Sequence, residues 1–146
     1  MAKTFTYDYA PPAVTVDLVL ISTEEPPHVL LIRRGRAPFA GHWALPGGFI
    51  EMNETLEESA RRELQEETGL TTRKLTMLGV YDNPTRDPRG RTLSVAYTAI
   101  VNRKTMKAIA ADDAAEADWF PLRRPPKLAF DHAEILADAR RWLKRG

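Results

Sequence analysis

The stretch 48–70, GFIEMNETLEESARRELQEETGL, constrains this chain more than any other. Near its end, Glu63, Glu66 and Glu67 fall within one turn of a helix, and Glu54 lies upstream of them. Residues three and four apart on a helix are neighbours, so the three carboxylates project from one side and repel one another. A cation must offset that repulsion, and ligands that are all oxygen suit a hard ion such as Mg²⁺ or Mn²⁺.

The limits of this helix are also readable. Thr55 followed by Glu58 fits a capping box, in which each side chain bonds to a backbone amide near the start of the helix. Gly69 can take the left-handed conformation that ends a helix. Apolar residues recur at the spacing of a buried stripe: Leu56, Ala60 and Leu64. Burial of that stripe would turn the glutamates towards a cleft.

The spacing of this stretch matches a known motif. Gly48 is followed by five residues, Glu54, seven more residues and then RELQEETGL at 62–70. This resembles the Nudix box, G-x5-E-x7-R-E-U-x-E-E-x-G-U with U aliphatic, at every defining position. An acidic solvated helix would account for the glutamates but not for their register with both glycines and Arg62. The resemblance implies an α/β (α+β) fold, the Nudix α/β/α sandwich with a central mixed β-sheet.

The resemblance also implies site residues. The catalytic residues it predicts are Glu54, Arg62, Glu63, Glu66 and Glu67, and the metal ligands it predicts are Gly47, Glu63, Glu66 and Glu67. Gly47 would act through its carbonyl, and Glu63 is either a third carboxylate ligand or the base that orients water. Arg62 would pair with a glutamate and fix its rotamer, while Glu54 would support the site. Mg²⁺, or Mn²⁺ in its place, is the cofactor expected.

A second acidic cluster, AADDAAEADWF at 110–120, precedes a short strand. Nudix enzymes often supply another carboxylate from this region, so Asp113 and Glu116 are alternative candidates for the base, with Asp112 behind them. Exposed loop acids without a catalytic role would give the same pattern.

Arginines on either side of the box are candidates for substrate binding, because guanidinium groups match phosphate oxygens. They are Arg34, Arg36, Arg86, Arg89 and Arg91. Solvated basic loops are the alternative interpretation for both groups. Pro84 lies fifteen positions after Gly69, an offset similar to that of the ADP-ribose pyrophosphatase branch of the family.

The rest of the chain favours one domain. Apolar and β-branched runs predict strands at 13–22, 28–33, 74–81 and 92–101, and the first two form a hairpin. Asp131 with Glu134 opens a C-terminal helix whose apolar face is Ile135, Leu136, Ala139 and Leu143, and we expect His132 to act in capping it. Residues 1–12 read as an N-terminal arm, and residues 13–146 as a single Nudix hydrolase domain.

Composition excludes several classes of function. The net charge is +1, which favours neither a nucleic-acid partner nor a membrane surface. The chain has no cysteine, which excludes disulfides, thiolate metal sites and cysteine nucleophiles. The start, MAKTFTYDYA, lacks the apolar core of a signal peptide, so a cytoplasmic location is expected.

Three functions follow from the resemblance. The first is Mg²⁺-dependent hydrolysis of ADP-ribose, or a related small nucleotide substrate, to AMP and ribose 5-phosphate. The second is a house-cleaning pyrophosphohydrolase of nucleoside triphosphates, such as oxidised dNTPs. The third is a non-catalytic ADP-ribose sensor, although such regulators carry a C-terminal winged helix for which this chain has no room. Members of the ADP-ribose branch are commonly dimers, so a homodimer is also implied.

Overall fold

The computed structural model describes residues 4–69, 71–104 and 114–145. Its elements are, in order, β1 (Ala13–Ser22), β2 (His28–Arg34), β3 (Trp43–Ala44), β4 (Gly47–Phe49), α1 (Leu56–Thr68), β5 (Thr76–Tyr81), β6 (Thr92–Val101), β7 (Ala114–Pro121) and α2 (His132–Arg145). Within these ranges the strands form one sheet, in the order β3-β2-β1-β6-β5, with β4 paired to β1 and β7 paired to β2. The sheet is mixed, as predicted, because β1 runs parallel to β6 and antiparallel to β2 and β4.

The long strands were predictable and the short ones were not. β1 and β6 have the predicted bounds, β2 is one residue longer, and β5 begins two residues later than expected. The hairpin of β1 and β2 is confirmed. β3 and β4 were missed because two and three residues carry too little periodicity to reveal a strand.

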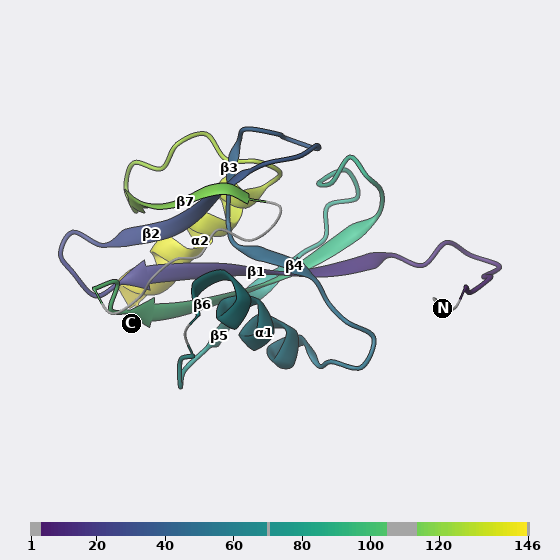
Figure 1. Cartoon of the computed structure of the whole chain (residues 1–146), viewed down its shortest axis with the longest axis horizontal. Coiled ribbons are helices and arrows are strands. Elements are labelled where there is room, and N and C mark those ends of the chain that lie inside the picture. Colours follow the sequence, from purple (N-terminus) through teal and green to yellow (C-terminus); the bar gives the residue numbers. More distant parts are fainter. Residues whose placement is uncertain (1–3, 70, 105–113, 146) are drawn as a thin grey trace.

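The two helices cover opposite faces of the sheet, which confirms the predicted sandwich (Figure 1). β1 is buried from both sides, since Val16, Leu18 and Leu20 belong to the core cluster that includes α1. Val19 and Ile21, which alternate with them, belong to the cluster that includes α2. This is why β1 reads as a nearly continuous apolar run.

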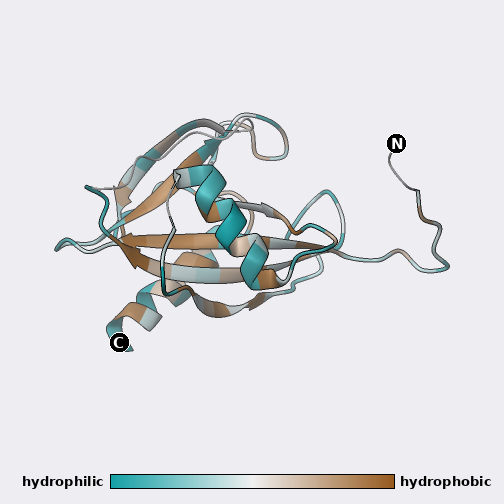
Figure 2. Cartoon of the chain, turned by 60° about the horizontal axis from the view of Figure 1, so that its bottom comes forward, coloured by the Kyte–Doolittle hydropathy of each residue, from teal (hydrophilic) through white to brown (hydrophobic). Residues whose placement is uncertain are grey.

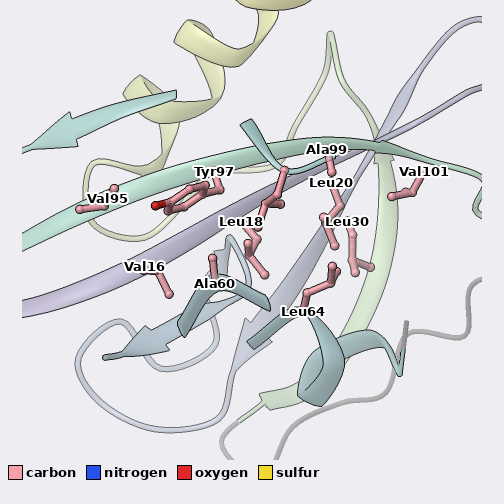
Figure 3. Packing of buried hydrophobic residues seen from close by; sticks show 11 residues of the cluster. Val16, Leu18, Leu20, Leu30, Ala60, Leu64, Val95, Tyr97, Ala99 and Val101 are labelled. Carbon is pink, nitrogen blue, oxygen red and sulfur yellow. The ribbon is translucent and has the colours of Figure 1, made fainter. Parts of the chain in front are cut away.

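Helix α1 has the limits that the sequence predicted. The Thr55 side chain accepts from the Glu58 amide, the Glu58 carboxylate accepts from the Thr55 amide, and Gly69 ends the helix at φ 74°. Ala60 and Leu64 are fully buried and point into the core beside Leu18 (Figure 3). The outer face of α1 is hydrophilic (Figure 2). One face of this helix is therefore fixed against the sheet, and its carboxylates take their direction from that contact.

Two further features bear on the domain and its surroundings. Residues 4–12 are exposed and precede β1, while the division into an arm and one domain from residue 13 stays a prediction.

In the described residues we find no helix with the length and apolar character that a membrane span requires.

Candidate active site

A cavity of about 520 Å³ brings together acidic and basic side chains from distant parts of the chain. The acidic group comes from α1: Glu63, Glu66 and Glu67. The basic group comes from β2 and from two loops: Arg34, Arg36, Arg86 and Arg89. Gly47 of β4 also lines the cavity. Both signs of charge in one cavity suit a ligand that carries metal-bound phosphates.

Arg62 organises the carboxylates of α1. Its Nε donates to both carboxylate oxygens of Glu54, at 3.0 and 2.8 Å. Its Nη1 donates to Glu63 at 2.9 Å and to Glu66 at 3.3 Å, and its Nη2 donates to the Phe49 carbonyl at 3.1 Å. The bonds to Glu54 and Glu63, chiefly the one to Glu54, raise the pKa of Arg62, and the bond between Arg62 and Glu54 lowers the pKa of Glu54. Arg62 thus fixes several glutamate rotamers at once.

Glu63 differs from the other carboxylates of this group because it is both buried and placed against the backbone of β4. Burial raises the pKa of Glu63, although its bond to Arg62 acts in the opposite direction. A Cβ added at Gly48 would lie 2.6 Å from Oε1 of Glu63. A side chain at position 48 would displace this carboxylate, so the first glycine of the predicted box has a structural reason.

Gly47 has an equally tight environment. It pairs with Asp17 of β1, and a Cβ added at Gly47 would lie 2.1 Å from the carbonyl oxygen of Val16. No side chain can replace its hydrogen without moving one of the two strands. The glycine pair therefore keeps β4 close to β1 on one side and close to Glu63 on the other.

The donor set suits a divalent cation, since the candidate ligands are carboxylate and carbonyl oxygens only. Glu63 lines the cavity, and its carboxylate lies where a side chain at position 48 would otherwise be. Among the residues that the structure describes, no three acidic or histidine side chains are already gathered as a metal shell. The chemistry of the site therefore fits Mg²⁺ or Mn²⁺, while the ligand set stays a prediction.

Two buried residues that line the cavity, Asp17 and His132, were not predicted as site residues. Asp17 is buried, accepts a short hydrogen bond from Ser94, and lies 3.5 Å from Nε2 of His132. The Leu45 amide donates to Nδ1 of His132 at 3.0 Å, so His132 ties a loop to the start of α2 rather than capping that helix. The signal for Asp17 was available, because it is the one charged residue in AVTVDLVLIS.

His132 is fully enclosed, and burial lowers its pKa. The neutral ring accepts at Nδ1 from Leu45, which leaves its proton on Nε2, the nitrogen that faces Asp17. This arrangement fixes one tautomer and joins α2 to β1 and to the segment just before Gly47.

The predicted arginines do not all occupy the same surroundings. Arg86 is buried and donates through Nε and Nη2 to Asp131, at 2.9 and 2.7 Å. Arg89 bonds in the same bidentate way to the buried Asp87, from Nε to Oδ1 at 3.1 Å and from Nη2 to Oδ2 at 2.7 Å. Arg91 does not line the cavity, and donates to the Asp82 carbonyl at the base of the loop. Protein carboxylates thus already orient two of the guanidinium groups.

The alternative bases are placed differently from Glu63. Glu116 lies on β7 opposite Arg33 and forms an ion pair with it at 2.9 Å. Ile32 and Arg34 of β2 line the cavity, whereas neither Arg33 nor Glu116 is among the residues that line it. Asp112 and Asp113 lie outside the described residues.

Comparison with known proteins gives consistent results. A family model described as the NUDIX domain matches residues 11–139. The chain is 48% identical over 134 residues to an ADP-ribose pyrophosphatase of Methanocaldococcus jannaschii, covering 92% of this chain and 76% of that protein. It is 36% identical over 137 residues to the ADPR responsive transcriptional repressor NtrR of Acinetobacter baylyi, covering 90% of this chain. The chain spans 54% of the length of that repressor.

Solved structures share the fold over almost the whole chain. A MutT/nudix family protein from Enterococcus faecalis has a TM-score of 0.83 at 34% identity, covering 97% of this chain and 66% of that chain. The NUDIX domain of Shewanella oneidensis NrtR, complexed with ADP ribose, has a TM-score of 0.80 at 35% identity, covering 94% of both chains. The similarity therefore extends both to an enzyme and to a regulator.

Proposed function

The chain belongs to the NUDIX family and is one of its pyrophosphohydrolases, and on that premise we propose that it hydrolyses ADP-ribose to AMP and ribose 5-phosphate with Mg²⁺. The observation that carries this proposal is the cavity in which the α1 glutamates meet four arginines. A diphosphate needs both groups, since its oxygens are anionic and its linkage is inert to water without charge neutralisation. The similarity to an ADP-ribose pyrophosphatase supports the choice of substrate.

Glu66 and Glu67, with Glu63 and the Gly47 carbonyl, would hold the metal. When bound, Mg²⁺ would neutralise phosphate charge and lower the pKa of a water molecule. Arg62 serves this site by fixing carboxylate rotamers, and Glu54 serves it by fixing Arg62. Arg34, Arg36 and Arg89 would bind the phosphate oxygens.

In the reaction, water adds to one phosphorus atom, the bond from that phosphorus to the bridging oxygen breaks, and the water proton passes to a base. Glu63 is our candidate for that base, as it lines the cavity and burial raises its pKa. A role as third metal ligand is the alternative for Glu63. Asp113 and Glu116 stay as competing candidates for the base, although the ion pair between Glu116 and Arg33 favours Glu63.

Two other functions keep specific support. The similarity to NrtR and NtrR favours an ADP-ribose sensor that binds without turnover. The box glutamates alone would serve a triphosphate pyrophosphohydrolase equally well.

A substrate panel tests the three functions together. ADP-ribose, NADH, diadenosine polyphosphates and oxidised dNTPs are each incubated with the protein and Mg²⁺, and products are identified by mass spectrometry. We expect AMP and ribose 5-phosphate from ADP-ribose at the highest kcat/KM. A preference for a triphosphate would overturn the substrate, and binding of ADP-ribose without any product would favour the sensor.

A further inference from the structure

Three aromatic rings and two guanidinium groups form one contact cluster at the cavity. The guanidinium carbon of Arg89 lies 5.1 Å from the centre of the Phe49 ring and 5.6 Å from that of Phe130. That of Arg34 lies 5.1 Å from the Phe130 ring centre, and Phe39 packs edge-on against Phe130 at 4.8 Å. All of these residues except Phe39 line the cavity. We name them the aromatic cluster.

The protein holds this cluster in a fixed geometry. Arg89 is anchored by its bidentate bond to the buried Asp87, and Arg34 donates from Nε to the Pro38 carbonyl at 2.7 Å. Phe39 and Phe130 have φ values of 60° and 53°, a backbone region that residues other than glycine rarely adopt. Such backbone conformations persist where the surroundings impose them and are frequent at ligand sites.

The cluster also presents apolar surface that the fold leaves uncovered. The Phe49 side chain is 49% exposed and lies next to Gly48, the residue that faces the Glu63 carboxylate. A flat ligand ring at this position would cover Phe49 while the phosphates reach the carboxylates of α1. Stacking on an aromatic ring with a cation beside it is favourable for any nucleobase, since every base has a π face.

We propose that the aromatic cluster is the binding site of the nucleobase, with Phe49 as the ring on which the base stacks. The proposal rests on the proposed function only in that the ligand is a nucleoside diphosphate derivative. It differs from a second interpretation of the same contacts, in which the rings merely orient Arg89 towards the diphosphate. The two interpretations predict different ligand dependence, because only the first involves the base.

The test measures binding rather than turnover. Calorimetric titrations with Mg²⁺ compare α,β-methylene-ADP, which carries a base, with methylenediphosphonate, which carries the same phosphorus bridge and no base. Phe49→Ala removes the ring, and Phe49→Tyr keeps one. Phe5→Ala is the matched control, since Phe5 is also exposed but lies in the stretch that precedes β1.

We expect Phe49→Ala to weaken binding of α,β-methylene-ADP about tenfold or more, the scale of one lost base stack, and to leave methylenediphosphonate unchanged. Phe49→Tyr and Phe5→Ala should bind both ligands as the unaltered protein does. Equal weakening of both ligands would overturn the proposal in favour of Arg89 orientation, and no weakening of either would overturn it outright. Because no hydrolysis is measured, failure here is distinct from failure of the ADP-ribose assay.

Discussion

Arg62 carries one positive charge and lies within ion-pair distance of four carboxylates. Its nitrogens are 3.6 Å from Glu51, 2.8 Å from Glu54, 2.9 Å from Glu63 and 3.3 Å from Glu66. A single guanidinium therefore offsets only part of the repulsion among these groups, and Glu67 adds a further buried carboxylate. The excess of negative charge at one end of the cavity is what a divalent cation would neutralise.

Glutamine substitutions of the exposed Glu66 and the buried Glu67 test whether these two residues are metal ligands. Glu66→Gln and Glu67→Gln should each lower kcat for ADP-ribose at least about a hundredfold, since each removes a charge that acts on the transition state through the metal. Glu57→Gln is the control, because Glu57 is exposed on α1 and pairs with Arg61. Near-normal turnover in both site variants would contradict the assignment.

His132 gives a prediction about pH. Its pKa is lowered in the folded protein from an ordinary value of 6.5, so below that pH the unfolded chain binds a proton that the folded chain does not. The free energy of unfolding should therefore fall as the pH drops below 6.5, by at most about 1.4 kcal/mol per pH unit from this group.

The substitution His132→Asn would remove the group that binds a proton in the unfolded chain, while keeping an acceptor for the Leu45 amide. Urea unfolding at about pH 7.5 and about pH 5 should thus show a smaller loss of stability on acidification in His132→Asn than in the unaltered protein. His28→Asn, on the less enclosed β2 histidine, is the control. An unchanged difference between the two pH values would refute this account of His132.

At the scale of elements, β4 lies between β1 of the sheet and helix α1. Its two glycines face different neighbours, the Val16 carbonyl for Gly47 and the Glu63 carboxylate for Gly48. A backbone atom cannot give way without moving a strand, whereas the end of a side chain can rotate. The same added methyl group should therefore have different consequences at the two positions.

Gly47→Ala should lower the free energy of unfolding by about 1–3 kcal/mol, the usual cost of forced overpacking. Gly48→Ala should fold with a much smaller loss but lower kcat by up to about a hundredfold, because it displaces Glu63. Urea unfolding and ADP-ribose kinetics on both variants separate the two effects. A Gly48→Ala variant with full activity would show that the position of Glu63 does not matter.

The start of α1 is a second element-scale prediction. Thr55→Ala removes the hydroxyl that accepts from the Glu58 amide at 3.1 Å and should lower the free energy of unfolding by about 1 kcal/mol. Thr6→Ala, in the exposed stretch before β1, is the control. Equal stability of the two variants in urea unfolding would show that the capping box contributes nothing measurable.

Local signals explain which parts of this site were predictable. The limits of α1 follow from Thr55, Glu58 and Gly69, whose effects reach only a few residues along the chain. The bond from Leu45 to His132 joins residues 87 positions apart, and no local pattern indicates it. For the same reason, the sequence predicts that the guanidinium group of Arg86 binds an anion, but it does not predict that this anion is the carboxylate of Asp131.

At the scale of the whole molecule, the sheet assembles the cavity from segments that are distant in sequence. β1 is central, since it pairs with β2, β4 and β6. This pairing sets Gly47 opposite Asp17 and Gly48 opposite Val16, while α1 and α2 approach from opposite faces. The acidic and basic residues thus meet only in the folded chain, and we predict one site in which metal and diphosphate bind together.

The most direct test of that account is the formation of AMP from ADP-ribose by protein stripped of metal with EDTA, before and after Mg²⁺ is restored. We predict no AMP from the stripped protein, full recovery of AMP formation with Mg²⁺, and no recovery in a Glu66→Gln, Glu67→Gln double variant. AMP formation at the same rate with and without metal, or in the double variant, would contradict the account.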